Sequence, residues 1–573
     1  MKFTLFILFI LSFLVQINFS FSQKIDSSYY RSPIDFPISL SGNFGELRSN
    51  HFHSGIDIRT KGEEGKVVYA VADGFVSRIK VSAYGYGNAL YITHPNGQVS
   101  VYGHLQQYNK KITEYIRTQQ YNVESFEVDL FPQKNILKVN KGDTVALSGN
   151  TGGSEAPHLH FEIRDDKTEQ IKNPLLNGFF VPDSIKPTIT ELVLYPKNIH
   201  AAVNNENERI NYDVKNVRGN LSLVNNKPIE VSGIVGFAIE TNDEENDHAG
   251  KNGTYNIQLY VDNELRYEYK IAAFAFEQTR NINAHIDYQL KKKSGKLIQK
   301  CFVEPNNKFP CYKFDKNRGF VNFTDDSIHL VKIVVSDVSS NQNTLLFLVQ
   351  SHKNIAKEKD KNKGQTQDYF YHNIDNYFSR DGIKINIPNS VLQNDISFEY
   401  KMEVSHKNYS PIYKIHHEEE GLLAAYSLKI KPTKSISDKL KSKLLIASVN
   451  HGGGLSAEGG SYNTTTNTVD ANLKNFGYFT VAIDTVKPFV GNIIIDKPSA
   501  KIRNIIVKIS DNFSGIKSYK GTVDGKWILM EYDYKNARLI YTFDEKYNDE
   551  LPHKFAIIVT DQKGNEAKAV KEF

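Results

Sequence analysis

Short runs of β-branched and aromatic residues alternate with turn residues through the first third of the chain. Residues 67–71 predict one strand, and residues 89–93 and 99–102 predict a hairpin across a Pro-Asn-Gly turn. Residues 158–163 predict a further strand. Because strands joined by tight turns pair antiparallel, the pattern predicts an antiparallel β domain over residues 23–182.

One segment of this domain has a different period. Residues 109–121 contain Ile112, Tyr115 and Ile116 at the spacing of one helix face. The pattern predicts a short helix within an insertion at about residues 107–138.

Beyond residue 183 the chain repeats itself. The paired landmarks, in chain order, are Asp183–Pro187 with Asp484–Pro488, Ser232–Ile234 with Ser514–Ile516, Val261–Asn263 with Val523–Gly525, and His329, Asp337 and Asn341 with His553, Asp561 and Asn565. Landmarks that recur in one order indicate related domains. We therefore predict two Ig-like β-sandwiches, over residues 183–353 and 483–573.

The segment between the two repeats has two parts. Residues 354–367 are rich in Lys, Asp and Gln, which is typical of a solvated linker. Residues 368–482 predict another β-rich domain. Its glycine run at Gly452–Gly454 lacks the Lys-Ser/Thr of a phosphate-binding loop, so we predict a plain flexible loop there. The whole chain is therefore predicted to be mainly β.

The first 22 residues have the features of a secretory signal peptide. Lys2 precedes a mostly apolar run over residues 5–15, and small residues follow at Ser20 and Ser22. We expect cleavage after Ser22. The alternative is an uncleaved membrane anchor, but the run falls short of the ~20 residues of a spanning helix. The expectation is an exported bacterial protein, periplasmic, extracellular or associated with the cell envelope, with no integral membrane segment after cleavage.

Charge and cysteine content narrow the function classes. The formal net charge of +5 over 573 residues permits attraction to anionic polymers such as cell wall, but it is no signature of nucleic-acid binding. The chain has two cysteines, Cys301 and Cys311. Export favours a structural disulfide between them, and two unpaired thiols are the alternative.

Three short segments hold the candidate chemistry: 53–57, 102–104 and 158–160. Together they supply four histidines and one aspartate. Neutral imidazole and carboxylate are suitable ligands for a catalytic zinc ion, and three protein ligands leave a fourth position for water. A further histidine can move protons because its pKa lies near neutral pH.

The spacing of these residues makes geometric demands. His158 and His160 are two apart in a predicted strand, so they share one face, with Cα atoms about 6.6 Å apart. His53 and Asp57 would lie about 13 Å apart in a straight strand. The backbone must therefore bend, and Gly55 permits this. A helical pair is the rival geometry, which Gly55 disfavours.

These segments stand within a longer series of short motifs, at residues 55–57, 71–74, 84–88, 102–105, 141–143, 148–152 and 157–162. In order and spacing, the stretch from about Asn43 to Pro174 resembles the lysostaphin/LytM-type metallopeptidases, family M23. The resemblance implies a compact antiparallel β domain of the LytM (duplicated-hybrid-motif) type with a groove. It also implies that the substrates are peptide cross-links or bridges of peptidoglycan.

The resemblance assigns roles by position. It makes His53, Asp57 and His160 the ligands of one zinc ion. It makes His104 and His158 the catalytic pair that orients or deprotonates the water. The sequence departs from compact family members in the 36 residues between His104 and Lys141. This insertion is predicted either to form a groove wall beside His104 or to be a packing embellishment.

Three functions remain open at this point. The first is a secreted zinc endopeptidase, which the full set of five residues favours. The second is a non-catalytic scaffold of the same fold that activates other wall hydrolases. The third is a surface protein that binds an envelope partner through its β-sandwiches. The sequence does not distinguish a D-Ala–diaminopimelate cross-link from a glycine-type bridge as the bond cleaved.

Overall fold

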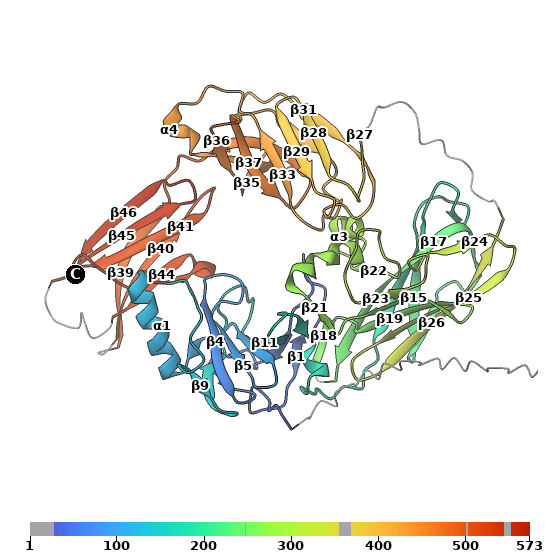
Figure 1. Cartoon of the computed structure of the whole chain (residues 1–573), viewed down its shortest axis with the longest axis horizontal. Helices are drawn as coiled ribbons and strands as arrows, with labels where there is room; N and C mark the ends of the chain where they lie inside the picture. Colours follow the sequence, from blue (N-terminus) through green and yellow to red (C-terminus); the bar gives the residue numbers. More distant parts are fainter. Residues whose placement is uncertain (1–27, 247, 354–367, 500–501, 544–551) are drawn as a thin grey trace, which may run out of the picture.

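The computed structural model describes residues 28–246, 248–353, 368–499, 502–543 and 552–573. The predicted signal peptide (1–22) and linker (354–367) lie outside these ranges. The fold is mainly β, as predicted. Figure 1 shows its parts arranged in a ring, with the N-terminal domain in blue, the first sandwich in green, the middle domain in orange and the C-terminal sandwich in red. Within the described residues, no helix is long and apolar enough to cross a bilayer.

The N-terminal domain is built on two antiparallel sheets. The main path of the larger sheet runs β1-β2-β11-β6-β5-β4-β8, and the smaller runs β3-β10-β7. The bounds are β1 Leu40–Gly42, β2 Ile56–Arg59, β3 Val67–Tyr69, β4 Gly74–Val81, β5 Ala89–Thr93, β6 Gln98–Gly103, β7 Gln107–Tyr108, β8 Val128–Leu130, β10 Thr144–Leu147, β11 His158–Asp165 and β12 Ile171–Lys172. The predicted strands and hairpin are confirmed. β11 is flanked by β2 and β6, so both of its edges are paired.

The predicted helix is α1, Lys110–Val123. The Asn109 side chain caps its first turn by accepting from the Ile112 N–H at 3.0 Å. Glu124 ends it in the left-handed conformation. Ile112 and Ile116 are buried in the domain core, so one face of the insertion packs against the domain.

The remaining parts are β-sheet domains. The bounds of their principal strands are β13 Thr188–Pro196, β17 Ile229–Glu245, β19 Asn256–Val261, β25 Ile328–Ser336 and β26 Gln342–Ser351 in the first sandwich; β28 Asn376–Arg380, β29 Ile383–Ile387, β33 Tyr426–Ile430, β34 Leu444–Val449, β37 Thr468–Leu473 and β38 Gly477–Ile483 in the middle domain; and β39 Phe489–Ser499, β40 Ile502–Ser510, β41 Ile516–Val523, β43 Glu531–Asp533, β44 Arg538–Thr542, β45 Lys554–Asp561 and β46 Glu566–Glu572 in the C-terminal sandwich.

The internal repeat has a structural counterpart at most of its landmarks. His329 bonds to Asp262 at 2.6 Å, and His553 bonds to Asp524 at 2.7 Å. One landmark pair was wrong. Ser232 lies inside the long strand β17, whereas Ser514 lies in the loop before β41. A Ser-Gly-Ile triplet fits both a strand and a turn, so the match was fortuitous.

Cys301 and Cys311 form no disulfide. Both are buried free thiols. Burial raises the pKa of Cys311 to about 12, which keeps the thiol protonated and unreactive. The favoured disulfide was therefore wrong, and the two cysteines serve as small apolar core residues.

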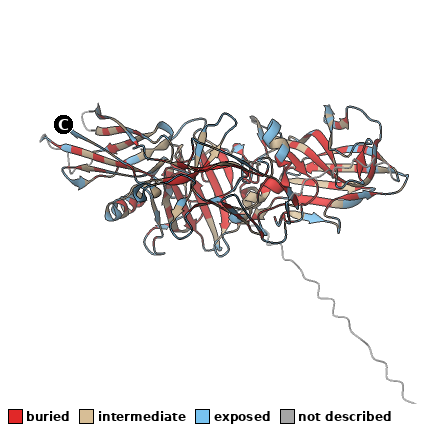
Figure 2. Cartoon of the chain, turned by 90° about the horizontal axis from the view of Figure 1, so that it is seen from above, coloured by how far each residue is buried: buried red, intermediate tan, exposed pale blue. Residues whose placement is uncertain are grey.

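The N-terminal domain and the first sandwich share one hydrophobic core. Figure 2 shows buried segments along the length of the molecule. The ring of Phe52 stacks on Phe309 at 4.5 Å, and β12 pairs with β21 (Ala273–Phe274) of the sandwich segment. This continuous apolar burial fixes the two parts relative to each other.

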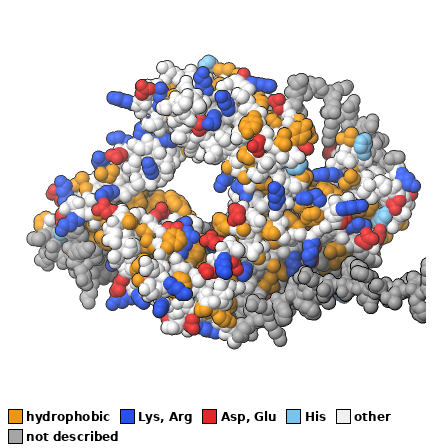
Figure 3. All heavy atoms as spheres, in the orientation of Figure 1, with side chains coloured by type: hydrophobic (Ala, Val, Ile, Leu, Met, Phe, Trp, Pro, Cys, Tyr) orange, Lys and Arg blue, Asp and Glu red, His pale blue; other side chains and the backbone are white. Residues whose placement is uncertain are grey.

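The ring closes where the C-terminal sandwich meets the insertion. Tyr121 of α1 contacts Trp527 edge-on with ring centroids 5.1 Å apart. Glu124 pairs with Lys520 at 2.6 Å. Tyr84 contacts Tyr534 at 4.8 Å. The closure surrounds a central opening, visible in Figure 3.

Trp527 is the single tryptophan of the chain, so its fluorescence reports this closure. Tyr121→Ala removes the ring that covers the indole, and we expect the emission maximum to move to longer wavelength. Tyr121→Phe keeps the ring and is expected to leave the spectrum unchanged. Identical spectra for the wild type and Tyr121→Ala would contradict the closure.

Candidate active site

Strand register brings three of the predicted residues together. In the antiparallel pair of β2 and β11, His160 lies directly opposite Asp57. His53 lies just before β2 and approaches the same point. All three side chains are buried, with 3–6% of their surface exposed. Residues more than 100 positions apart in the sequence therefore form one cluster.

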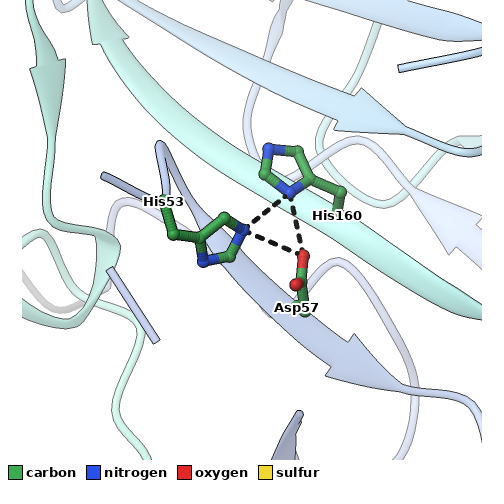
Figure 4. Close-up of side chains that lie close together, drawn as sticks. All are labelled: His53, Asp57 and His160. Carbon is green, nitrogen blue, oxygen red and sulfur yellow. Dashed lines mark hydrogen bonds and ion pairs between the residues drawn. The ribbon is translucent and has the colours of Figure 1, made fainter. Parts of the chain in front are cut away.

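The ligand atoms of the three residues converge, as Figure 4 shows. His160 Nδ1 lies 2.9 Å from Asp57 Oδ1. His53 Nε2 lies 3.1 Å from the same oxygen and 3.2 Å from His160 Nδ1. One nitrogen from each histidine and one carboxylate oxygen thus face a common point.

Two glycines make room for this convergence. The chain bends at Gly55, as the separation of His53 and Asp57 required, but not through a left-handed φ. A Cβ at Gly55 would lie 2.4 Å from the Phe161 carbonyl oxygen, so the bend depends on close approach to β11. A Cβ at Gly103, opposite His160, would lie 3.2 Å from the His160 Cβ.

The second nitrogen of each clustered histidine is held by a neighbour. His53 Nδ1 donates to the Asn43 carbonyl at 2.8 Å. His160 Nε2 donates to Glu162 Oε1 at 2.9 Å. These bonds occupy the rear nitrogen of each ring and turn His53 Nε2 and His160 Nδ1 toward the common point, the orientation that metal ligation requires.

Glu162 supports the site from behind. It is fully buried, and its Oε1 also accepts from Ser54 Oγ and Tyr86 OH, both at 2.6 Å. Its Oε2 accepts from Arg164 Nε at 2.6 Å. Sequence reasoning quoted Glu162 only as part of a motif. Its place two residues after His160, on the same face of a strand, was the signal that could have found it.

His104 and His158 stand beside the cluster. Their ring centroids are 4.8 Å apart, and His158 Nε2 lies 3.3 Å from Asp57 Oδ1. His104 Nδ1 donates to the Thr151 carbonyl, and His158 Nδ1 donates to the Ala156 carbonyl, both at 2.8 Å. In each ring Nδ1 is therefore occupied by a backbone carbonyl, and Nε2 is the nitrogen that remains for other partners.

Burial and hydrogen bonding set the charges of these groups. Burial lowers the pKa of His53 and, together with the nearby His160 and His158, lowers that of His104 to about 3. Burial also opposes the charged form of His160, but its bonds to Asp57 and Glu162 raise its pKa to about 9. Despite burial, His53 and the hydrogen bonds from His158, His160 and His53 hold the pKa of Asp57 well below its usual range. Asp57 is therefore an ionised carboxylate.

Arg48 is a further neighbour that sequence reasoning missed. Its guanidinium donates to Asp57 Oδ2 at 2.8 Å, which leaves Oδ1 toward the histidines. Two other histidines lie outside the cluster. His51 is exposed, and it was left out of the prediction. From its place in the predicted hairpin turn we expected His94 to be solvated, and this was wrong. It is buried and bonded to the Asp73 carbonyl and Ser100 Oγ, which anchor the hairpin turn.

A cavity of about 470 Å³ is lined in part by Thr151, whose carbonyl accepts from His104 Nδ1, whereas His104 itself does not line it. Gln106 and Thr151 of the N-terminal domain line it, together with Arg117 of α1 and Lys535 of the C-terminal sandwich. The insertion therefore forms one wall of this cavity, and the C-terminal sandwich forms another.

Models of two known protein families match parts of the chain. Residues 51–121 match the model of peptidase family M23, and residues 367–484 match that of the Zu5-like domain. The chain thus contains an N-terminal M23 peptidase domain and a Zu5-like domain, with β-sandwich domains in addition.

The similar proteins described next each match about a quarter of the chain. The chain is 33% identical over 147 residues to an uncharacterized metalloprotease of Haemophilus influenzae, covering 25% of this chain and 26% of the relative. It is 32% identical over 118 residues to the DD-carboxypeptidase/endopeptidase Mpg of Neisseria meningitidis serogroup B, covering 21% of each. A zinc containing peptidase from Vibrio cholerae is 27% identical with a TM-score of 0.18, over 24% of this chain and 37% of that structure. The chain therefore spans about a quarter of the length of the curated relatives.

Glu162 should govern metal affinity without touching the metal. Glu162→Gln removes the charge that orients His160, and we expect zinc affinity, measured by chelator competition, to fall about 10–100-fold. Ser54→Ala removes one bond to Glu162 but leaves its contact with His160, and it serves as the matched control. Equal affinities for Glu162→Gln and wild type, in a folded variant, would contradict this role.

Proposed function

We propose that the M23 domain is a zinc-dependent endopeptidase that hydrolyses peptide cross-links or bridges of bacterial peptidoglycan. The observation that supports it best is the convergence of His53 Nε2, Asp57 Oδ1 and His160 Nδ1 within 3.2 Å. Two imidazoles and one carboxylate suit zinc better than calcium or magnesium, which prefer oxygen ligands. In this proposal the three residues hold one zinc ion.

The remaining histidines have distinct tasks in this proposal. When bound, zinc would lower the pKa of a water molecule toward ~7 and polarise the scissile carbonyl. His158 and His104 would exchange protons with the attacking water and with the leaving amine through their Nε2 atoms. Because their Nδ1 atoms are fixed by carbonyl groups, the two rings are oriented before substrate binds.

The substrate class is inferred from the relatives and the surroundings. Among the similar proteins, one of Neisseria meningitidis is named a DD-carboxypeptidase/endopeptidase, and one of Vibrio cholerae is named a peptidoglycan DD-endopeptidase. The predicted signal peptide would deliver the domain to the same compartment as the cell wall. We infer an envelope location, periplasmic or extracellular.

The alternative function is a scaffold of the same fold that activates other wall hydrolases. Such a protein needs no metal ligands or proton-handling groups. Here five histidine and aspartate side chains converge, four of them with under 10% of their surface exposed. This favours the enzyme. The sandwich and Zu5-like domains are left to bind an envelope partner or to position the peptidase.

Digestion of purified cross-linked muropeptides separates these functions. We expect the zinc-loaded mature chain to cleave them, as seen by mass analysis. His160→Ala should lose both zinc and activity, whereas His104→Ala should keep zinc and lose about 10²–10⁴-fold in rate, because a proton-transfer group is removed.

Two results would contradict the proposal. Cleavage that survives both His160→Ala and a chelator would rule out zinc catalysis. Failure of the zinc-loaded wild type to cleave any muropeptide would favour the scaffold.

The cavity beside His104 should contribute to substrate binding. Arg117 lines it with a basic side chain, while peptidoglycan stem peptides carry carboxylates. Arg117→Glu is expected to raise KM about tenfold, the effect of losing ~1.4 kcal/mol of charge interaction, with zinc content unchanged. Lys111→Glu makes the same charge change elsewhere on α1 and is the control. Equal KM values for the two variants would indicate that the insertion serves packing alone.

A further inference from the structure

Each β-sandwich contains a second kind of polar cluster, made only of carboxylates. In the first sandwich, Asp183, Asp243 and Asp337 each offer an oxygen, and these atoms lie within 4.8 Å of one another. In the C-terminal sandwich, Asp484, Asp511 and Asp561 do the same. Neither cluster takes part in the peptidase site.

The two clusters occupy equivalent places in the two folds. Asp183 and Asp484 lie just before the first strands, β13 and β39. The pairing of β13 with β17 matches Thr188 to Asn242, and that of β39 with β40 matches Phe489 to Ser510. The next residues along the chain are Asp243, within β17, and Asp511, which directly follows β40.

The third carboxylates of the two clusters, Asp337 and Asp561, also occupy equivalent positions. Asp337 follows β25 and Asp561 ends β45, and each is locked by an asparagine four residues on. The Asn341 and Asn565 amides donate to them at 2.7 Å, and both amides also donate to the backbone carbonyl of the first aspartate, at 3.1 and 3.0 Å. The same frame has been kept in two domains whose other residues have diverged.

One oxygen in each cluster is buried and has no hydrogen-bond partner. These atoms are Oδ1 of Asp243 and Oδ1 of the equivalent Asp511. Asp243 exposes only 5% of its surface. A buried acceptor without a donor costs about 1–3 kcal/mol, and more when it is charged. The same unpaired atom in two separate domains indicates a missing positively charged partner.

Protein side chains do not supply that partner. Among the described residues, no Lys, Arg or His lies within ion-pair distance of any of the six carboxylates. Lys563 is near the second cluster, but its ammonium donates to the carbonyls of Leu444 and Gly460, both at 2.7 Å.

We propose that each sandwich binds one calcium ion, through Asp183, Asp243 and Asp337 in the first and Asp484, Asp511 and Asp561 in the second. All-oxygen donors without histidine or cysteine favour a hard cation. Calcium–oxygen distances of about 2.3–2.6 Å allow two ligand atoms up to about 4.8 Å apart to reach one ion. The spacing in both clusters satisfies this.

The positions of the sites indicate what calcium does. Asp183 is the first residue after the peptidase domain, and Asp484 ends the segment that matches the Zu5-like domain. Each ion would link the segment that leads into its sandwich, at Asp183 or Asp484, to the ends of two strands of that sandwich. Calcium would therefore fix the angle at two junctions of the ring.

Calorimetric titration of the zinc-loaded mature chain with calcium chloride tests the proposal. We expect two calcium ions per wild-type chain, one for Asp243→Asn, one for Asp511→Asn and none for the double variant. Asp213→Asn and Asp496→Asn make the same charge change at exposed positions of the same sandwiches and should keep two. A wild type that binds no calcium, or a double variant that still binds two, would overturn the proposal.

Thermal unfolding gives a second measurement. Calcium should raise the melting temperature of the wild type but not that of the double variant. Without calcium, Asp243→Asn should melt no lower than the wild type, because it removes a repelling charge. If that variant does not fold, Asp183→Asn, at a half-buried position, takes its place. A shift of equal size with magnesium chloride would overturn the assignment to calcium.

Discussion

The antiparallel register between β2 and β11 is the constraint on which the peptidase site depends. It places Asp57 opposite His160 and sets His158 two residues away on the same face. A slip of one residue would turn both histidines to the other side of the sheet. The register is held from both sides, because β6 pairs with the other edge of β11 and places Gly103 opposite His160, where a Cβ would lie only 3.2 Å from the His160 Cβ. The geometry of the site thus follows from backbone pairing and two glycines.

Buried charge is the second requirement, and it is met in different ways along the chain. Asp57 and Glu162 are both buried at the peptidase site, and each has an arginine on its outer oxygen, Arg48 and Arg164 respectively. Their inner oxygens face histidines. Among the residues that the structure describes, no such basic side chain forms an ion pair with the aspartate clusters of the sandwiches. A buried carboxylate needs a compensating positive charge. At the peptidase site, arginine side chains supply part of that charge. At the aspartate clusters, a cation from solution would supply it.

Sequence reasoning reached the strands, the α1 helix and the five polar residues because each leaves a local signal. Period-2 runs mark strands, helical spacing marks α1, and a residue pair such as His158 and His160 shares a strand face. It did not reach Arg48, Asn43 or the role of Glu162, because their contacts depend on how separate segments fold together. His94 was misplaced for the same reason: a turn sequence indicates exposure, whereas Asp73 and Ser100 come from other segments to bury it. The disulfide prediction for the two cysteines was wrong because it rested on the oxidising compartment alone. Export permits a disulfide, but the packing of the core determines whether two thiols meet.

The contacts that join neighbouring parts of the ring rest on different interactions. The peptidase domain and the first sandwich are joined by a common apolar core, in which Phe52 and Phe309 stack. The C-terminal sandwich meets α1 through a few aromatic edges and a half-exposed ion pair, Glu124 with Lys520. Apolar burial contributes roughly 25 cal/mol per Å², whereas an exposed ion pair contributes at most about 1 kcal/mol. Of these two contacts, the one at α1 therefore separates at the lower cost. Because that contact also walls the cavity lined by Thr151, the more weakly held of the two contacts is the one that borders the residue supporting His104.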